Sequence, residues 1–223
     1  MVVLVTSFHR SYTSLTCQWL DRCGVEFPGP LMGAGVGNEH GHFEHLPLLQ
    51  LVNQVVRKEI SETQAAIAFE SIVSDELCDR EKVYGFKAPD AILFAKELLA
   101  IGAIDQLILP LRSFEEVMDS LEQRRTKQLK SGEFRFSRFK QLFFVRSVYN
   151  LYRRLIWWRK WQRNYQEIKE IIGKPRVSVL DFESNDVWDL KLNDVIDQVQ
   201  SLDTNIPLGA AKKTSLSWIS DTV

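Results

Sequence analysis

The first segment able to do chemistry is a polar stretch that follows a short apolar run at the amino terminus. The run from Val2 to Thr6 is rich in β-branched residues and predicts a buried strand, and a helical pattern from Leu15 to Leu20 begins a few residues later. A phosphate at such a strand–helix junction would meet backbone N–H groups, the positive end of the helix dipole, a guanidinium group and hydroxyls. The side chains that supply these groups are Arg10, Ser11, Thr13 and Ser14. The junction therefore predicts an anion site, with a Ser/Thr-capped helix after an ordinary strand as the alternative.

A second polar segment, from Asn38 to His45 (NEHGHFEH), is the richest source of a catalytic base. An unperturbed imidazole titrates near roughly 6.5, so His42 or His45 could accept a proton at neutral pH. The same residues form a compact set of metal-ligand types, but their spacing does not match a helical zinc pattern such as HExxH. The sequence therefore predicts no metal at this segment. The alternative to a segment that supplies a catalytic base is a plain helix start with exposed histidines.

Alternating strands and helices must position these groups. The predicted strands are Val2–Thr6, Lys82–Lys87, Ile104–Leu111 and Val177–Phe182. After the first helix, the predicted helices are Leu46–Arg57, Ser61–Asp79, Asp90–Ala100, Ser113–Gln128 and one near Val187–Gln200. A β-α-β-α rhythm predicts an α/β fold of three layers, in which a parallel sheet carries helices on both faces.

Length, charge and cysteine content limit the number of domains, the class of partner and the cellular compartment that we expect. A chain of 223 residues with 45% hydrophobic residues can bury one core, so we expect a single domain over residues 1–223. A formal net charge of -1 argues against a protein whose whole surface binds nucleic acid or anionic membrane, so any anion site must be local. Three cysteines without a CxxC pair suggest neither a disulfide framework nor structural zinc, and the amino-terminal apolar run is too short for a signal or spanning segment. We therefore expect a soluble, cytoplasmic protein.

The amino-terminal junction resembles the 5′-phosphosulfate-binding loop of the sulfotransferase family, particularly the bacterial branch whose loop reads GMHRSGTS. The matching stretch runs from Ser7 to Ser14 (SFHRSYTS), and it departs from the family where Ser7 and Tyr12 replace glycines. The resemblance implies a fold like that of phosphate-loop nucleoside triphosphate hydrolases. It also implies that the donor 3′-phosphoadenosine-5′-phosphosulfate (PAPS) is bound by His9, Arg10, Ser11, Thr13 and Ser14.

Two later segments extend the resemblance to about Arg125. The segment IDQLILPLRSFEEVMDSL looks like the family's 3′-phosphate motif, in which a strand-end Arg is followed eight positions later by a helical Ser, and Arg112 and Ser120 have this spacing. A guanidinium group can grip a phosphate in a bidentate manner while the hydroxyl adds a donor. GFKAPDAILF is similar to a family segment with Lys and Pro after a strand, which implies that Lys87 faces the donor or acceptor; a solvated strand end is the alternative.

The resemblance implies transfer of a sulfuryl group from PAPS to an acceptor hydroxyl of a small molecule, glycan or lipid headgroup, without a metal. Arg10 would stabilise the transferring group, and Glu44 matches the family's glutamate after Gly-x-Phe/Trp and would serve as the base, with His42 as second choice. Because Tyr12 could occupy the donor pocket, the alternative is a catalytically impaired relative that binds a nucleotide or partner.

The segment from Phe134 to Gln166 combines nine Arg or Lys residues and eleven aromatics with no acidic residue. One interpretation is a helix that buries a deep aromatic side, including Trp157, Trp158 and Trp161, and turns its charges to water. The other is a surface helix that contacts anionic lipid or a polyanionic acceptor. Helical aromatic faces are more often core than membrane contacts, which favours the first.

Overall fold

The computed structural model describes residues 1–33, 42–79, 81–130 and 143–181, and the side chains of 129, 143–148 and 181 are outside this description. Four parallel strands form one sheet in the order β2-β1-β3-β4. The strands are β1 (Val2–Val5), β2 (Tyr84–Lys87), β3 (Gln106–Leu111) and β4 (Val177–Asp181). The α/β class and the parallel sheet are thus confirmed, and the predicted carboxyl-terminal helix near residues 187–200 lies outside the described residues.

The helices fall at the predicted places, with ends that local chemistry explains. They are α1 (Thr13–Arg22), α2 (Leu46–Val56), α3 (Glu62–Glu76), the 3-10 helix η1 (Ala91–Phe94), α4 (Ala95–Ile101), α5 (Phe114–Lys130) and α6 (Phe143–Ile171). Helix α3 begins with a capping box in which the Ser61 hydroxyl accepts from the Gln64 N–H, and α4 ends at Gly102 in the left-handed region.

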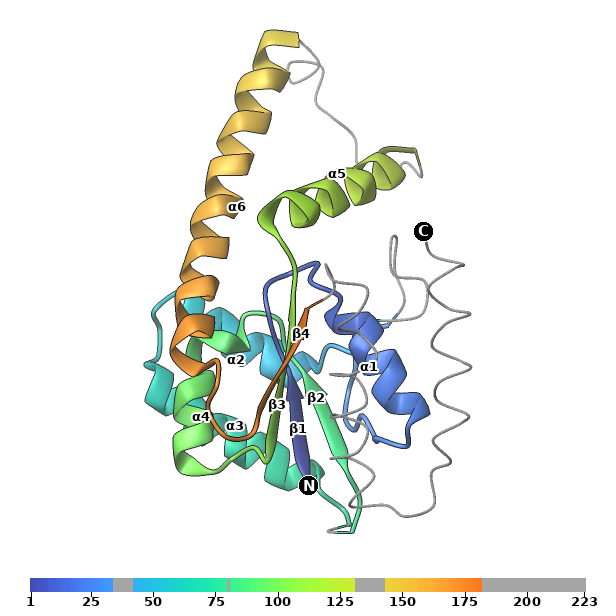
Figure 1. The fold of residues 1–223 in the computed structure, drawn as a ribbon, viewed down its shortest axis with the longest axis vertical. Helices are drawn as coiled ribbons and strands as arrows, with labels where there is room; N and C mark the ends of the chain where they lie inside the picture. The colour runs from blue at the N-terminus through green and yellow to red at the C-terminus, as the bar shows by residue number, and fades with distance from the viewer. Residues whose placement is uncertain (34–41, 80, 131–142, 182–223) are drawn as a thin grey trace.

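Alternation along β1 distributes the core between the two faces of the sheet. Val2 and Leu4 pack in a cluster with side chains of α2, α3, α4 and the carboxyl-terminal end of α6, whereas Val3 and Val5 pack with α1. Figure 1 shows α1 on one side of the strands and α2, α3 and α4 on the other. Helices therefore cover both faces, and the ends of β1, β2 and β3 meet at a single edge because the strands are parallel.

Helix α6 differs from the sequence expectation of a deeply buried aromatic side. Among the side chains of α6 from residue 149 onward, those that join the hydrophobic core are Ile168 and Ile171, at its carboxyl-terminal end. Trp157 and Trp161 are half-buried and Trp158 is exposed, so the prediction of deep burial is wrong. The physical reason is length, because a helix of 29 residues extends about 43 Å and passes well beyond the sheet (Figure 1). Over the described residues, no helix combines the length and apolarity needed to cross a membrane.

Candidate functional site

The loop after β1 is tied to the end of β2 and has an unusual backbone. The Thr6 hydroxyl donates to the Ala88 carbonyl at 2.8 Å and accepts the Ile92 N–H at 3.1 Å, so it fixes the start of the loop against the turn into η1. Arg10 and Tyr12 have φ angles of 67° and 62°. A non-glycine residue in this region costs about 1 kcal/mol, so other contacts must hold the loop in place.

One of these contacts joins Tyr12 to Arg112. The Arg112 guanidinium lies 4.4 Å from the centre of the Tyr12 ring, its Nη1 donates to the Arg10 carbonyl at 3.1 Å, and its Nε lies 3.6 Å from the Glu116 carboxylate. The tyrosine thus adopts the glycine-like conformation that the loop requires, and its ring stacks under a guanidinium. This group is the one that the sequence predicts for the 3′-phosphate, and it is engaged by protein groups here.

A second contact joins the loop to α5. Arg10 Nε donates to the Ser120 hydroxyl at 3.0 Å, across 110 positions of sequence. The two predicted phosphate motifs therefore meet, since Arg10 and Ser120 come from one motif each and Arg112 contacts the backbone of Arg10. Strand β3 lies beside β1, which brings the helix after β3 over the loop after β1.

A cavity of about 340 Å³ opens beside Arg10, between the loop, α5 and α6. It is lined by four guanidinium groups and a histidine together with two aromatic rings, and the lining residues are His9, Arg10, Leu121, Arg124, Arg125, Gln128, Tyr149, Arg153 and Trp157. Burial, followed by the charges of Arg124 and Arg112, lowers the pKa of Arg10. Among the described residues no acidic side chain lines the cavity, so it is suited to a ligand with several negative charges and a flat apolar part.

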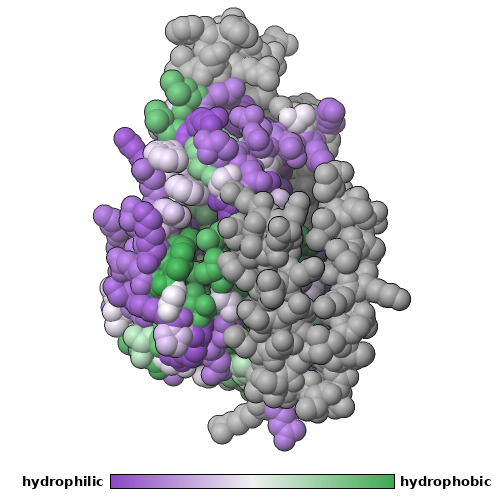
Figure 2. Space-filling view, in the orientation of Figure 1, coloured by the Kyte–Doolittle hydropathy of each residue, from purple (hydrophilic) through white to green (hydrophobic). Residues whose placement is uncertain are grey.

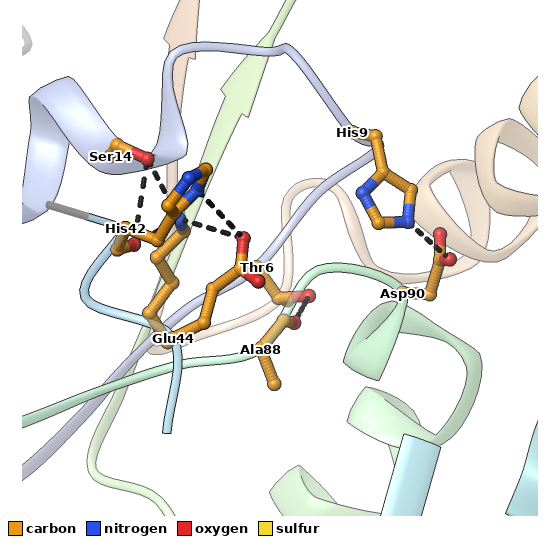
Figure 3. A network of polar contacts seen from close by, with 8 residues as sticks. Thr6, His9, Ser14, His42, Glu44, Ala88 and Asp90 are labelled. Atoms are coloured by element: carbon orange, nitrogen blue, oxygen red, sulfur yellow. Dashed lines mark hydrogen bonds and ion pairs between the residues drawn. The ribbon is translucent and has the colours of Figure 1, made fainter. Parts of the chain in front are cut away.

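A buried ammonium group lies on the other side of the loop. The Lys87 side chain is 1% exposed, and its Nζ donates to the Ser14 hydroxyl at 2.8 Å and to the His42 carbonyl, with Glu44 Oε1 at 3.3 Å. Figure 3 shows Ser14, His42 and Glu44 close to one another. Burial lowers the pKa of Lys87 although the nearby Cys17 and Glu44 oppose it, and burial likewise lowers the pKa of His42. Lys87, Glu44 and Ser14 thus form one polar cluster, and the solvated strand end is excluded for Lys87.

A third polar group connects the loop to α6. Asp90 accepts from His9 Nε2 at 2.9 Å and from Asn164 Nδ2 at 2.5 Å, and Figure 3 shows His9 turned toward Asp90 and away from the Ser14 cluster. Burial raises the pKa of Asp90, but the hydrogen bonds from His9 and Asn164 outweigh it and hold this pKa below its usual value. Asp90 has a φ of 64°, so the helix predicted to begin there starts one residue later, as η1.

The other predicted residues are placed as follows. Ser11, in the loop, and Thr13, at the start of α1, are buried, and neither is among the residues that line the cavity. His45 points away from the Lys87 cluster, with its Nε2 3.7 Å from the Glu76 carboxylate. His40 and Glu39 lie outside the described residues, and within the described part of the chain no group of three His, Cys, Asp or Glu side chains is arranged to hold a metal.

The sequence reasoning did not identify Arg124, Arg125 and Tyr149 as site residues, nor the bonds of Asp90 to His9 and Asn164. A signal exists for Arg124, because it follows Ser120 by one helical turn and Gln128 follows it by another, which places these three side chains on one face of α5. No comparable signal predicts Asn164, which lies 74 positions from Asp90.

Comparison of the chain with protein-family models, with curated proteins and with solved structures finds no match.

Proposed function

We propose that the protein is a sulfotransferase that binds PAPS and transfers its sulfuryl group to an acceptor hydroxyl, on a fold of the phosphate-loop type. The observation that carries this proposal is the meeting of Arg10 with Ser120 at the mouth of an arginine-lined cavity. PAPS carries a phosphosulfate at one end and a ribose phosphate further along, so it needs two adjacent cationic groups and a surface for its base.

The donor fits the cavity in one orientation best. Arg10 would hold the phosphosulfate end, and the ribose 3′-phosphate would lie toward Ser120, Arg124 and Arg125, which already border or line the cavity. The rings of Tyr149 and Trp157 offer apolar faces for the adenine. Arg112, the residue expected for the 3′-phosphate, would have to leave the Tyr12 ring and Glu116 to contribute.

For transfer, the phosphosulfate end of the donor would have to reach from the cavity across the loop after β1 to the Lys87 cluster. The acceptor oxygen attacks sulfur, the bond from sulfur to the bridging oxygen breaks, and the acceptor proton moves to the carboxylate of Glu44, with His42 as the second candidate base. Lys87 and Ser14 lie at the start of α1, where a cation and a hydroxyl would stabilise charge that develops on the leaving phosphate.

A second candidate function is a binding module for an adenosine nucleotide without turnover. Two observations favour it: Arg112 is stacked on Tyr12, and the proposed base Glu44 is paired with Lys87. The Lys87–Glu44 pair would have to open before Glu44 could accept a proton, and Arg112 would have to leave Tyr12 before it could join Arg124 and Arg125 at the 3′-phosphate.

The test is thermal unfolding with adenosine 3′,5′-bisphosphate, followed by a transfer assay with PAPS and a panel of hydroxyl acceptors. At a ligand concentration ~100-fold above Kd, binding should stabilise the native protein by about 2.7 kcal/mol, which corresponds to a rise in Tm of roughly 5–10 °C. Arg124→Gln should lose most of this rise, whereas Lys127→Gln should keep it because Lys127 is exposed on the same helix and does not line the cavity.

The transfer assay separates the two candidates. If Glu44 is the base, Glu44→Gln keeps the thermal shift and lowers turnover by ~10²- to 10⁴-fold. A shift without turnover in the native protein identifies the binding module, and the absence of any shift with either PAPS or the bisphosphate refutes both functions.

A further inference from the structure

The outer side of α6 presents a run of exposed apolar residues that the proposed catalysis does not use. Five such residues occur within eight positions, and their exposure ranges from 38% to 62%. They are Leu151, Tyr152, Leu155, Ile156 and Trp158, named here the α6 apolar face. Figure 2 shows apolar, green atoms beside hydrophilic, purple ones over the upper part of this helix.

The helical repeat places these five side chains together. At about 100° per residue they span an arc of about 160° and leave no charged position within that arc between Leu151 and Trp158. The opposite side of the helix makes the contacts with the body of the protein. There Trp157 packs edge-on against Phe8, Asn164 donates to Asp90, and Ile168 is buried. Trp158, at the border of the α6 apolar face, also packs edge-on against Phe114 of α5, whereas Leu151 and Leu155 are more than half exposed.

Cationic side chains border this face on three sides. The same helical repeat places Arg153 and Lys160 along one edge and Arg154 along the other, and it places Arg159 and Arg163 on the same side one to two turns further along. The sequence of α6 has no acidic residue before Glu167. An apolar face with tyrosine and tryptophan, bordered by long basic side chains, is the composition of a helix that lies in a membrane interface.

The charge decides between the occupants that could cover this face. A second copy of the chain would bring two basic helices together and would repel itself, whereas an anionic surface would be attracted to both the cations and the apolar side chains. We propose that the outer side of α6 is a peripheral binding surface for membranes that contain anionic lipid. The helix would lie in the plane of the interface, and its buried carboxyl-terminal end would attach it to the body of the protein. This inference does not depend on the identity of the nucleotide or on transfer.

The experiment is flotation of the full-length protein with vesicles of phosphatidylcholine alone or with ~30% phosphatidylserine. We expect binding to the anionic vesicles only, and a fall in affinity as salt rises. Arg159→Gln/Arg163→Gln should weaken the binding by roughly 10- to 30-fold, and Leu151→Gln/Leu155→Gln by at least about tenfold, because both variants replace exposed side chains.

Matched controls lie elsewhere on the protein. Arg57→Gln, at the end of α2, and Ile67→Gln, on α3, replace side chains with comparable exposure and should bind as the native protein does. Equal binding to both kinds of vesicle, or no binding to either, overturns the proposal. Binding to anionic vesicles that survives Leu151→Gln/Leu155→Gln also overturns it, because the attraction would then be that of a general polyanion or acidic partner rather than of a membrane interface.

Discussion

Asp90 offers a sharp test of how α6 is held against the loop after β1. Its carboxylate accepts hydrogen bonds from His9 in the loop and from Asn164 in α6, so a single side chain joins three separate segments. Asp90→Asn removes the charge while it keeps a residue that tolerates the left-handed backbone at this position, where φ is 64°. The substitution therefore reports on the carboxylate rather than on backbone strain.

The magnitude follows from the two bonds. A buried hydrogen bond to a charged group contributes ~1.5–3 kcal/mol, and the bond from Asn164 is of this kind because Asn164 is buried. In the variant, the carbonyl oxygen of Asn at position 90 can still accept this bond, so only part of the contribution is lost. The bond to His9 contributes up to about 1 kcal/mol, because the His9 side chain is 38% exposed and the solvent screens the interaction. We expect Asp90→Asn to lower the free energy of unfolding by about 2 kcal/mol at pH 7.

The pH dependence gives an independent signature. The pKa of Asp90 is lower in the folded protein than its ordinary value of about 3.9, so the folded state binds fewer protons than the unfolded state in that range. Its stabilising contribution is complete above about pH 5 and is lost as the pH falls through the folded pKa. The difference between native protein and Asp90→Asn should thus shrink at low pH.

Urea unfolding at pH 7, 5 and 3.5 measures this difference. Asp75→Asn is the control, since Asp75 is exposed on α3 and its replacement should change stability by less than about 0.5 kcal/mol. A difference for Asp90→Asn that stays below about 0.5 kcal/mol at pH 7, or that is as large at pH 3.5 as at pH 7, would refute the assignment of the carboxylate as the junction.

Two further predictions concern groups buried near the loop. Burial lowers the pKa of Lys87, so the unfolded chain binds more protons than the folded one in the alkaline range below about 10.4. The free energy of unfolding of the native protein, compared with that of Lys87→Met, should therefore rise between pH 7 and pH 10 in denaturant titrations. A difference that stays constant or falls contradicts the buried ammonium group. Burial raises the pKa of Cys17 to about 12 and that of Cys23 to about 11. Iodoacetamide at pH 8 should therefore modify only the exposed Cys78 in the native protein, and all three thiols in denaturant. Early modification of Cys17, detected by mass spectrometry, would disprove its burial.

Local patterns in the sequence determined most of the architecture. Short apolar runs between turn signals predicted the four strands, the first of them rich in β-branched residues. Ser61 predicted the start of α3 because its hydroxyl caps the free N–H groups. Hydroxyls and Arg10 directly after β1 also indicated an anion site, since a strand followed by a helix points backbone donors at one spot.

The tertiary structure alone decided which of these groups meet. The pairing of β1 with β3 brings Ser120 to Arg10, and the long reach of α6 brings Tyr149, Arg153 and Trp157 to the cavity while it leaves Leu151 and Leu155 exposed. Tertiary packing also stacks the Arg112 guanidinium on the Tyr12 ring and buries Lys87 beside Glu44. Periodicity predicts which side of an element is apolar, but contacts between residues far apart in sequence depend on strand order and packing, which no local pattern encodes.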